Sequence, residues 1–308
     1  GGDPFEPVGQ VKSMATSSYR LFSFGENEIK AWDLTGNKRA KPTSDLAAHF
    51  QPAAKPITAA AWNPNNQIVC SGDGDGHLHF SLSSGKYVHG LRADGKGQGA
   101  AIRSIAWSSR SKYVCSAGDG PCLNLWDVTK KSLIRTFGGH NSRVNCVSFG
   151  RADVLLASGG EDGRLLLHNV QLMNKTELKM SGGGDGASRP AISSLRFSSL
   201  KKFLVGVTTD SGHVRIWDTT QTKSIVTFKK HSAPASGVAF SKKHRALVCS
   251  CSLDRTLRFY DIAKGNEINI TTCTEPLSCI DFREDGQTVA VGTLQGKVII
   301  YDLRKISS

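Results

Sequence analysis

The 308-residue sequence lacks the long apolar run that a membrane-spanning helix requires. Such a helix needs roughly 18–20 consecutive apolar residues, and no segment of this chain approaches that length. The first residues also lack the apolar core of a secretory signal, because Pro4, Glu6 and Pro7 interrupt them. With 39% hydrophobic and 21% charged residues, the composition predicts a soluble globular protein.

Cysteine pairs with metal-ligand spacing are missing as well. The eight cysteines are Cys70, Cys115, Cys122, Cys146, Cys249, Cys251, Cys273 and Cys279, and none forms a Cys-x-x-Cys pair. Most of them lie in segments that alternate like β-strands, which disfavours a zinc site. The sequence therefore predicts reduced, buried thiols in a cytosolic or nuclear protein, with no metal and no cofactor.

Acidic residues are scarce. The chain has 26 Asp and Glu against 39 Lys and Arg, which gives a formal net charge of +13. A strongly basic protein attracts acidic partners. Charge alone leaves three classes of partner open: nucleic acid, an acidic protein surface and an anionic membrane.

One pattern repeats along the whole chain. A short alternating segment ends in an aromatic residue that is often followed by Asp, as in Ile29–Asp33 and Leu123–Asp127. The aromatic position recurs at residues 32, 81, 126, 168, 217, 260 and 301, where Ser81 and His168 are degenerate copies. The copies are 41 to 49 residues apart, close to the roughly 40–45 residues of a four-stranded WD-repeat blade. We therefore expect an all-β fold, a seven-bladed WD-repeat β-propeller.

A second alternating segment precedes six of these copies and also ends in an aromatic residue. These segments are Ile57–Trp62, Ile102–Trp107, Val144–Phe149, Ile192–Phe197, Ser236–Phe240 and Leu277–Phe282. Alternation over five or six residues indicates a half-buried strand. A small residue stands three positions before each aromatic, for example Ala59 and Gly237, which suits a crowded axis. We label the strands of a blade a to d from the axis outward, assign these segments to strand a, and expect four strands in blades 2 to 6.

Two blades carry His, Ser and Asp at the offsets of the hydrogen-bonded set of WD repeats. The sets are His140, Ser158 and Asp162, and His231, Ser250 and Asp254. The same residue types form catalytic triads, but a set that recurs in two blades indicates a structural network. In that network the Asp of the b–c turn holds the His. We interpret His168, which replaces the aromatic residue of blade 4, as a further structural histidine.

Two glycine-rich segments look at first like ligand loops. Residues 182–186 lack the Lys-Ser/Thr ending and the following helix of a phosphate loop, and residues 73–76 lack the distal Glu of a calcium loop. We interpret them as a surface loop and a tight b–c turn. Three connections from strand d to the next strand a are long, namely 44–56, 92–101 and 181–190. They should all emerge on one face, which we call the top. They either carry function or serve only to connect the strands.

The most specific stretches lie in the last two predicted blades. They are His231–Gly237, Leu253–Arg255, Tyr260–Asp261, Asp281–Phe282, Asp285–Gly286, Gly296–Lys297 and Tyr301–Arg304. Together with the degenerate copies at Ser81 and His168, they resemble one family. This is the neural-precursor-cell-expressed, developmentally down-regulated protein family, the γ-tubulin ring complex targeting adaptor. The resemblance runs from about Met14 to Arg304.

The resemblance implies a non-enzymatic protein-binding platform that targets the γ-tubulin ring complex to centrosomes and spindle microtubules for microtubule nucleation. It implies a cytoplasmic, cytoskeletal protein of the dividing cell. In that family a separate helical C-terminal region carries the γ-tubulin complex, so this chain corresponds to the targeting part. Two other classes stay open: another WD-repeat scaffold, such as a ubiquitin-ligase substrate receptor or RNA-processing subunit, and an enzyme. The lack of a convergent catalytic set disfavours the enzyme.

The two ends of the chain are expected to meet in the ring. We assign residues 14–308 to the propeller, and residues 1–13 to either an added leader or a divergent N-terminal strand. Strand b of blade 1, at Tyr19–Phe24, follows Met14 directly, so its strand a is missing from the recognisable pattern. Propellers close by pairing strands from both ends of the chain. Phe5–Lys12 is a candidate for one of the strands missing from the pattern.

Many basic residues lie in a–b and c–d turns, which open on the second face of a propeller, the bottom. The candidate partner-binding residues are Arg110, Lys112, Lys130, Lys131, Lys201, Lys202, Lys223, Lys242, Lys243 and Arg245. We call this set the basic bottom face. It is either a set of ordinary solvated side chains or a dock for an acidic protein segment, such as a tubulin tail. No aromatic residues interleave with these turns, which disfavours nucleic acid, and no membrane partner is expected.

Overall fold

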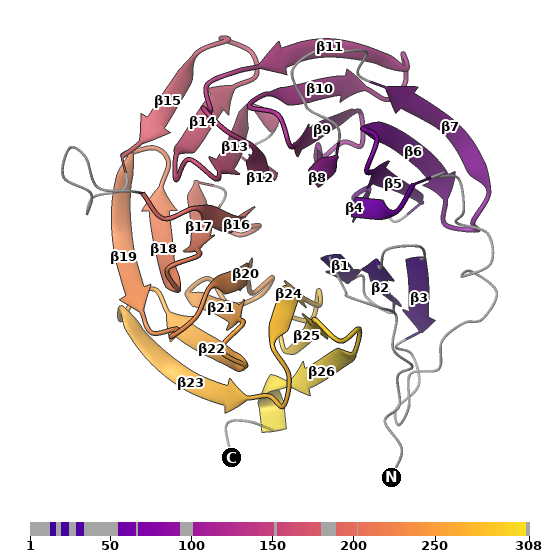
Figure 1. Cartoon of the computed structure of the whole chain (residues 1–308). Helices are drawn as coiled ribbons and strands as arrows, with labels where there is room; N and C mark the ends of the chain where they lie inside the picture. Colours follow the sequence, from indigo (N-terminus) through magenta and orange to yellow (C-terminus); the bar gives the residue numbers. More distant parts are fainter. Residues whose placement is uncertain are drawn as a thin grey trace.

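The alternating segments of the sequence fold into strands that surround a central axis (Figure 1). The computed structural model describes residues 13–16, 20–24, 29–33, 55–65, 67–92, 101–150, 153–179, 189–201 and 203–305. In these residues the strands form seven antiparallel sheets that stand side by side in a ring. The expected all-β propeller is therefore confirmed.

Each sheet is one blade, and the blades follow one another in chain order. Blade 1 contains β1 (Ser13–Thr16), β2 (Arg20–Phe24) and β3 (Ile29–Asp33). Blades 2 and 3 contain β4 (Ile57–Trp62), β5 (Ile68–Asp73), β6 (His77–Leu82), β7 (Tyr87–Arg92), β8 (Ile102–Trp107), β9 (Tyr113–Gly118), β10 (Leu123–Asp127) and β11 (Ser132–Phe137). Blades 4 and 5 contain β12 (Val144–Gly150), β13 (Leu155–Gly160), β14 (Leu165–Asn169), β15 (Lys175–Leu178), β16 (Ile192–Phe197), β17 (Leu204–Thr209), β18 (His213–Asp218) and β19 (Lys223–Lys229). Blades 6 and 7 contain β20 (Ala235–Phe240), β21 (Leu247–Ser252), β22 (Thr256–Asp261), β23 (Asn266–Thr272), β24 (Leu277–Phe282), β25 (Thr288–Thr293) and β26 (Val298–Asp302), followed by a 3-10 helix at Leu303–Lys305.

Blade 1 corrects the expectation for its inner strand. We expected strand a to be missing from the recognisable pattern, but Ser13–Thr16 forms it, pairs antiparallel with β2 and lies between β24 and β4. The expectation was wrong because this strand has only four residues and no closing aromatic residue. Phe5–Lys12, the segment considered for a missing strand, lies outside the described residues. Blades 2 to 6 have four strands each, as expected.

The inner strands β1, β4, β8, β12, β16, β20 and β24 contact one another in succession around the axis. In blades 2 to 7 the pairing of strands a and b shifts after the first residue of strand a, for example between Val144 and Cys146. Such a β-bulge leaves the second residue of the strand unpaired and kinks the backbone. The second residues are therefore free to reach the next blade.

Three of these bulged residues connect neighbouring blades. Each donates a side-chain hydrogen bond to the carbonyl of the first residue in the next inner strand. The pairs are Asn145 Nδ2 with Ile192 O (3.0 Å), Ser236 Oγ with Leu277 O (2.7 Å), and Ser193 Oγ with Ala235 O. The sequence pattern did not reveal these contacts, although a polar residue at the second position of each strand was a usable signal.

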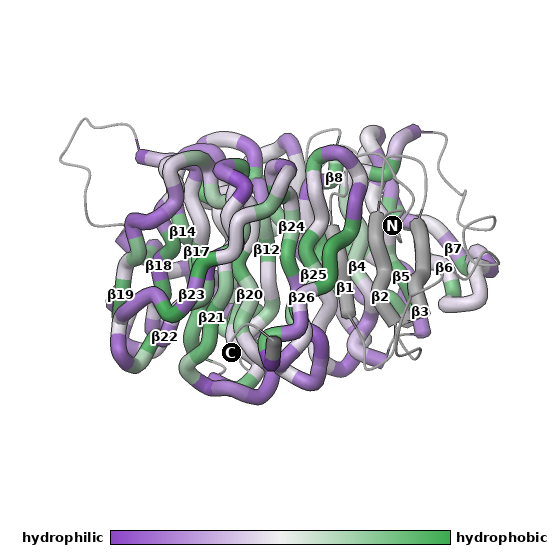
Figure 2. The backbone as a smooth tube through the Cα atoms, turned by 90° about the horizontal axis from the view of Figure 1, so that it is seen from below, coloured by the Kyte–Doolittle hydropathy of each residue, from purple (hydrophilic) through white to green (hydrophobic). Residues whose placement is uncertain are grey.

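The hydrophobic core lies between neighbouring sheets. All six residues of β17 and of β25 are buried, whereas the outer strand β23 alternates between exposed and half-buried residues. A strand covered on both faces has no polar side, and an outer strand keeps one. Figure 2 shows the same division, with hydrophobic residues along the strands and hydrophilic residues at the turns of both faces.

Glycines in the second strands allow neighbouring blades to approach closely. A Cβ atom on Gly159 would lie 2.4 Å from Cγ2 of Ile192 and 2.9 Å from Sγ of Cys146. A Cβ atom on Gly72 would lie 2.6 Å from Cγ2 of Ile102. Both isoleucines begin an inner strand and are completely buried, so they cannot move aside freely.

We predict that Gly159→Ala destabilises the fold by about 1–3 kcal/mol, because the added methyl group overlaps a buried branched side chain. The measurement is the free energy of unfolding in urea. Gly74→Ala is the matched control, since the nearest heavy atom to a Cβ there is Cβ of Lys55, at 4.0 Å. Equal stabilities for the two variants would contradict the close approach of blades 4 and 5.

Candidate partner-binding surfaces

His140 precedes the inner strand of blade 4 and uses both of its ring nitrogens. Nδ1 lies 3.0 Å from Oδ1 of Asp162 in the b–c turn, and Nε2 lies 2.8 Å from Oγ of Ser158 on β13. Burial alone would raise the pKa of Asp162. Hydrogen bonds from His140 and from the backbone N–H groups of Asn141 and Arg164 hold that pKa below its usual value.

Blade 6 repeats this arrangement with one addition. His231 Nδ1 lies 3.0 Å from Oδ2 of Asp254, and Nε2 lies 2.7 Å from Oγ of Ser250. Thr256, which the sequence reasoning did not single out, donates to Oδ1 of Asp254 at 2.6 Å. Burial opposes ionisation of Asp254, but the hydrogen bonds from Thr256 and the charge interaction with His231 lower its pKa to about 2.

The structure thus brings together all six residues of the two predicted sets, in a setting unlike a hydrolytic site. The side chains of His140 and His231 have no exposed surface, and Ser158 and Ser250 are completely buried. A catalytic serine must reach a substrate carbonyl, whereas these hydroxyl groups face the protein interior. The arrangement joins the start of strand a to strand b and the b–c turn.

His168 extends the network of blade 4. Its Nε2 lies 3.0 Å from Oγ of Ser158, so this hydroxyl lies between two histidines. Burial lowers the pKa of His168 to about 4, and the nearby His140 and Lys175 act in the same direction. His168 is therefore neutral at physiological pH, and its side chain is buried.

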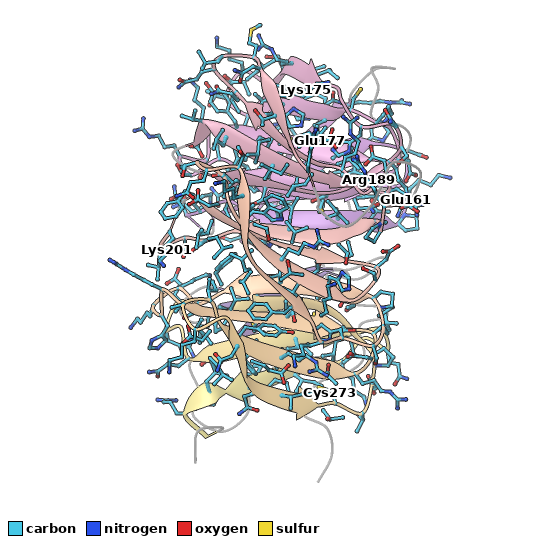
Figure 3. The ribbon with its side chains drawn as sticks, turned by 90° about the vertical axis from the view of Figure 1, so that its left-hand side faces the viewer. Glu161, Lys175, Glu177, Arg189, Lys201 and Cys273 are labelled. Carbon is cyan, nitrogen blue, oxygen red and sulfur yellow. The ribbon has the colours of Figure 1, made fainter. Side chains whose placement is uncertain are left out.

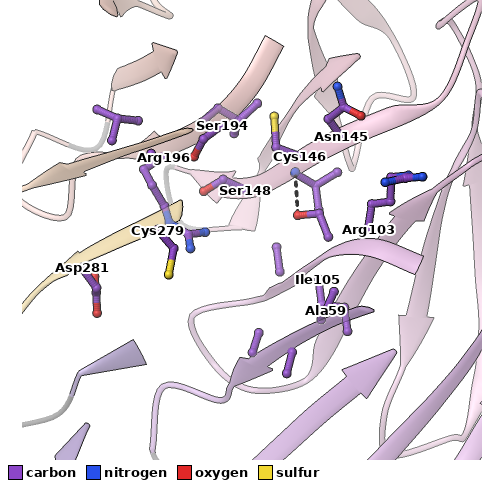
Figure 4. Close-up of a pocket in the computed structure, with 18 of the residues that line it drawn as sticks. Ala59, Arg103, Ile105, Asn145, Cys146, Ser148, Ser194, Arg196, Cys279 and Asp281 are labelled. Carbon is purple, nitrogen blue, oxygen red and sulfur yellow. Dashed lines mark hydrogen bonds between the residues drawn. The ribbon is translucent and has the colours of Figure 1, made fainter. Parts of the chain in front are cut away.

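The inner strands surround a central channel of about 390 Å³ (Figure 4). Its lining includes Arg103, Asn145, Cys146, Arg196 and Cys279. Burial raises the pKa of both thiols to about 12, although Arg196 acts against this. A nucleophilic cysteine must be a thiolate, and these two thiols remain protonated near neutral pH.

Nine of the ten residues of the basic bottom face are described, and Lys202 is not. They lie between strands a and b or between strands c and d. Arg110 and Lys112 follow β8, Lys130 and Lys131 follow β10, Lys201 follows β16, Lys223 begins β19, and Lys242, Lys243 and Arg245 follow β20. Lys201 and Lys242 are half-buried, and the other seven are exposed. The antiparallel topology directs all these turns to one face.

Carboxylates on this face are hydrogen-bonded to turn backbone. Asp127 Oδ1 accepts from Lys130 N at 2.8 Å, Asp218 Oδ1 from Thr220 N at 2.8 Å, and Asp261 Oδ1 from Ala263 N at 2.8 Å. Such Asp residues fix the turn conformation. None of the nine described cations of the basic bottom face forms an ion pair with a described carboxylate.

Three arginines at the top face are paired. Arg143 Nε lies 2.7 Å from Oε2 of Glu161, and Arg164 Nη2 and Arg189 Nη1 lie 2.5 and 2.6 Å from the two oxygens of Glu177. Figure 3 places Lys201 at one face of the ring and Glu161 and Arg189 toward the opposite face. These three arginines therefore have carboxylate partners, unlike the nine described cations of the basic bottom face.

Other sequence-based candidates are only partly visible. Residues 44–54, 93–100 and 181–188 of the three long connections lie outside the described residues, and this includes the glycine-rich segment 182–186. Asp73–Gly76 form the expected turn between β5 and β6, where Oδ1 of Asp73 accepts from Asp75 N and His77 N, each at 2.9 Å.

The described part of the chain lacks a metal-ligand cluster, a disulfide and a membrane-spanning helix. It contains no group of three or more His, Cys, Asp and Glu residues arranged to hold a metal ion. Its eight cysteines are all free thiols. No helix within it is long and apolar enough to cross a membrane.

Comparison with known proteins places these features in context. The pattern of the WD domain, G-beta repeat, matches residues 40–80, 85–127, 131–169, 181–218 and 222–261. The chain is 30% identical to protein NEDD1 of Homo sapiens over 292 residues, which are 93% of this chain and 42% of that protein. NEDD1 of Mus musculus gives the same identity and shares. The SIR4-interacting protein SIF2 of Saccharomyces cerevisiae is 24% identical over 320 residues, which cover 97% of this chain and 56% of SIF2.

We predict that His231→Ala lowers the free energy of unfolding by about 1–3 kcal/mol, because Ser250 and Asp254 lose a buried partner. Thermal and urea unfolding measure this loss. His244→Ala is the control, since His244 is exposed in the a–b turn of the same blade. A melting temperature for His231→Ala as high as that of the control would refute the role assigned to the network.

A pH dependence follows from His168. Its folded-state pKa of about 4 lies below the ordinary 6.5, so protons bind the unfolded chain first as pH falls. Stability from the neutral ring is complete above about pH 6.5 and is lost toward pH 4, by about 3 kcal/mol. We therefore expect His168→Tyr to gain about this much relative to the wild type between pH 7.5 and pH 4. Parallel stability curves across this range would contradict the burial of a neutral imidazole.

Proposed function

The chain belongs to the WD domain, G-beta repeat, family, and from this premise we propose that it is a non-enzymatic protein-binding platform of the NEDD1 kind. The buried His, Ser and Asp sets support this proposal, because their hydrogen bonds join strands and turns. A rigid ring that exposes turns on two faces is suited to binding other proteins.

Its proposed task is to target the γ-tubulin ring complex to centrosomes and spindle microtubules for microtubule nucleation. The support is 30% identity to NEDD1 over 93% of the chain. The chain covers 42% of the length of the NEDD1 relatives, so it would supply the part that selects the docking site, in the cytoplasm and on the cytoskeleton. The proposed partners are proteins of the spindle or centrosome.

One observation carries the choice of docking surface, namely the contrast between the two faces. Arg143, Arg164 and Arg189 at the top are paired with Glu161 and Glu177, whereas the nine described cations of the basic bottom face have no described carboxylate partner. Unpaired lysines on a rigid face attract an acidic partner without first breaking an internal ion pair. We assign the basic bottom face to an acidic protein segment, such as a tubulin tail.

A second candidate is another kind of WD-repeat scaffold, since SIF2 is similar over 97% of the chain. Affinity purification of the tagged full-length protein from dividing cells separates the two. Recovery of γ-tubulin complex components supports the first proposal. Recovery of ubiquitin-ligase or ribonucleoprotein subunits without γ-tubulin supports the second.

We predict that reversing Lys201, Lys223, Lys242 and Lys243 to Glu abolishes recruitment to spindles and centrosomes, because the partner would then meet like charge. Binding of the wild type should weaken steeply between about 50 and 200 mM salt, since exposed charges are screened over about 8 Å at physiological ionic strength. Fluorescence imaging of the tagged variant measures recruitment, and thermal unfolding checks the fold.

The control reverses Lys55, Lys179, Lys229 and Lys230, which lie at or near the top face and give the same change in net charge. It should localise as the wild type does. Normal recruitment of the folded bottom-face variant would exclude that face and favour the long top-face connections.

A further inference from the structure

A pocket of about 420 Å³ opens on the rim of the ring, between blades 3 and 4. It lies where the end of β11 meets the start of β15 (Figure 1). Arg135 and Phe137 of β11 line one side, and His168, Met173 and Lys175 of blade 4 line the other. We call it the rim pocket. Its volume falls in the range of about 300–1,000 Å³ that is usual for ligand sites.

A comparison of blade 4 with blade 6 relates the rim pocket to one residue of the sequence. Tyr260 occupies in blade 6 the position of His168 in blade 4, and each contacts the serine of strand b. Tyr260 is completely buried and stacks on Phe228 of the preceding blade, with ring centroids 4.2 Å apart. The smaller ring of His168 lies 5.5 Å from Phe137, tilted by 51°. His168 therefore packs less closely on its aromatic neighbour than Tyr260 does, and the rim pocket opens beside it.

The lining combines apolar surface with positive charge. Met173 and the small exposed part of Phe137 provide thioether and aromatic contacts for an inserted ring, beside the buried ring of His168. Met173 is 63% exposed, in a turn with a positive φ of 63°, so its side chain is accessible at the mouth. Arg135 and Lys175 contribute two cations, and no carboxylate is among the lining residues. Lys175 Nζ lies 3.4 Å from the carbonyl oxygen of Gly138 and is in no ion pair with a described residue.

We propose that the rim pocket binds one aromatic side chain of an acidic peptide segment in a partner protein. The aromatic ring enters the rim pocket beside His168 and contacts Met173 and the exposed part of Phe137. Carboxylates beside it in the peptide pair with Arg135 and Lys175 at the mouth. This site lies on the rim and is separate from the basic bottom face, so it goes beyond the proposed function.

The probe for the test is a fluorescein-labelled peptide of sequence Glu-Glu-Phe-Glu-Glu, titrated with the full chain while fluorescence anisotropy is followed. We expect saturable binding, and binding at least tenfold weaker for Glu-Glu-Gly-Glu-Glu, which lacks the ring. His168→Tyr should fill the rim pocket as Tyr260 fills its own junction, and weaken binding at least tenfold. If His168→Tyr keeps its melting temperature and still binds the phenylalanine peptide as the wild type does, the proposal is wrong.

A second pair of variants keeps the test decisive if His168→Tyr folds poorly. Arg135→Gln with Lys175→Gln removes the two cations of the mouth and should weaken binding about fivefold or more. Lys229→Gln with Lys230→Gln removes the same charge from exposed residues outside the basic bottom face and should leave binding within twofold. Equal losses in the two double variants, or tighter binding of a thymidine oligonucleotide that the phenylalanine peptide cannot displace, would overturn the proposal.

Discussion

The ring depends on how closely neighbouring sheets approach near the axis. The first residue of an inner strand, such as Ile192, enters the face of the preceding blade at a place where Gly159 has no side chain. The β-bulge that follows turns the second residue toward the next blade, where Asn145 and Ser236 donate to backbone carbonyls. Packing and hydrogen bonding thus act at the same place and hold each blade against the next. The antiparallel order of the strands within each blade then places its turns alternately on the two faces.

Fixed turns give the two faces different electrostatic characters. At the bottom, Asp127, Asp218 and Asp261 accept hydrogen bonds from the backbone of their own turns, which holds the turns in shape. The neighbouring lysines remain solvated and without described ion-pair partners. At the top, arginines are paired with Glu161 and Glu177. The nine described cations of the basic bottom face thus differ from these three arginines in having no described carboxylate partner, and the proposed docking of an acidic segment depends on that difference.

Departures from the repeat are the most informative positions in the ring. Blades 4 and 6 share the same His, Ser and Asp network, yet His168 leaves an opening where Tyr260 closes one. Blade 5 departs in another way, since Val207 stands where those blades have serine. As a result Trp217 Nε1 is buried without a hydrogen-bond partner in the described structure. A repeat tolerates such local losses because each blade is supported by two neighbours, and the losses create surfaces that differ from blade to blade.

The sequence by itself determined the inner strands of blades 2 to 7, the third strand of every blade and their order, because alternation with a period near 41 to 49 residues leaves few other folds. It also identified the two hydrogen-bonded sets, since their members recur at fixed offsets. It missed β1, which is too short to show the pattern, and it missed Thr256 and the bulged donors, whose partners are distant in sequence. Only the tertiary structure decided which charges find partners and where a small ring leaves a pocket. Both depend on distances between blades, and a linear pattern carries no such distances.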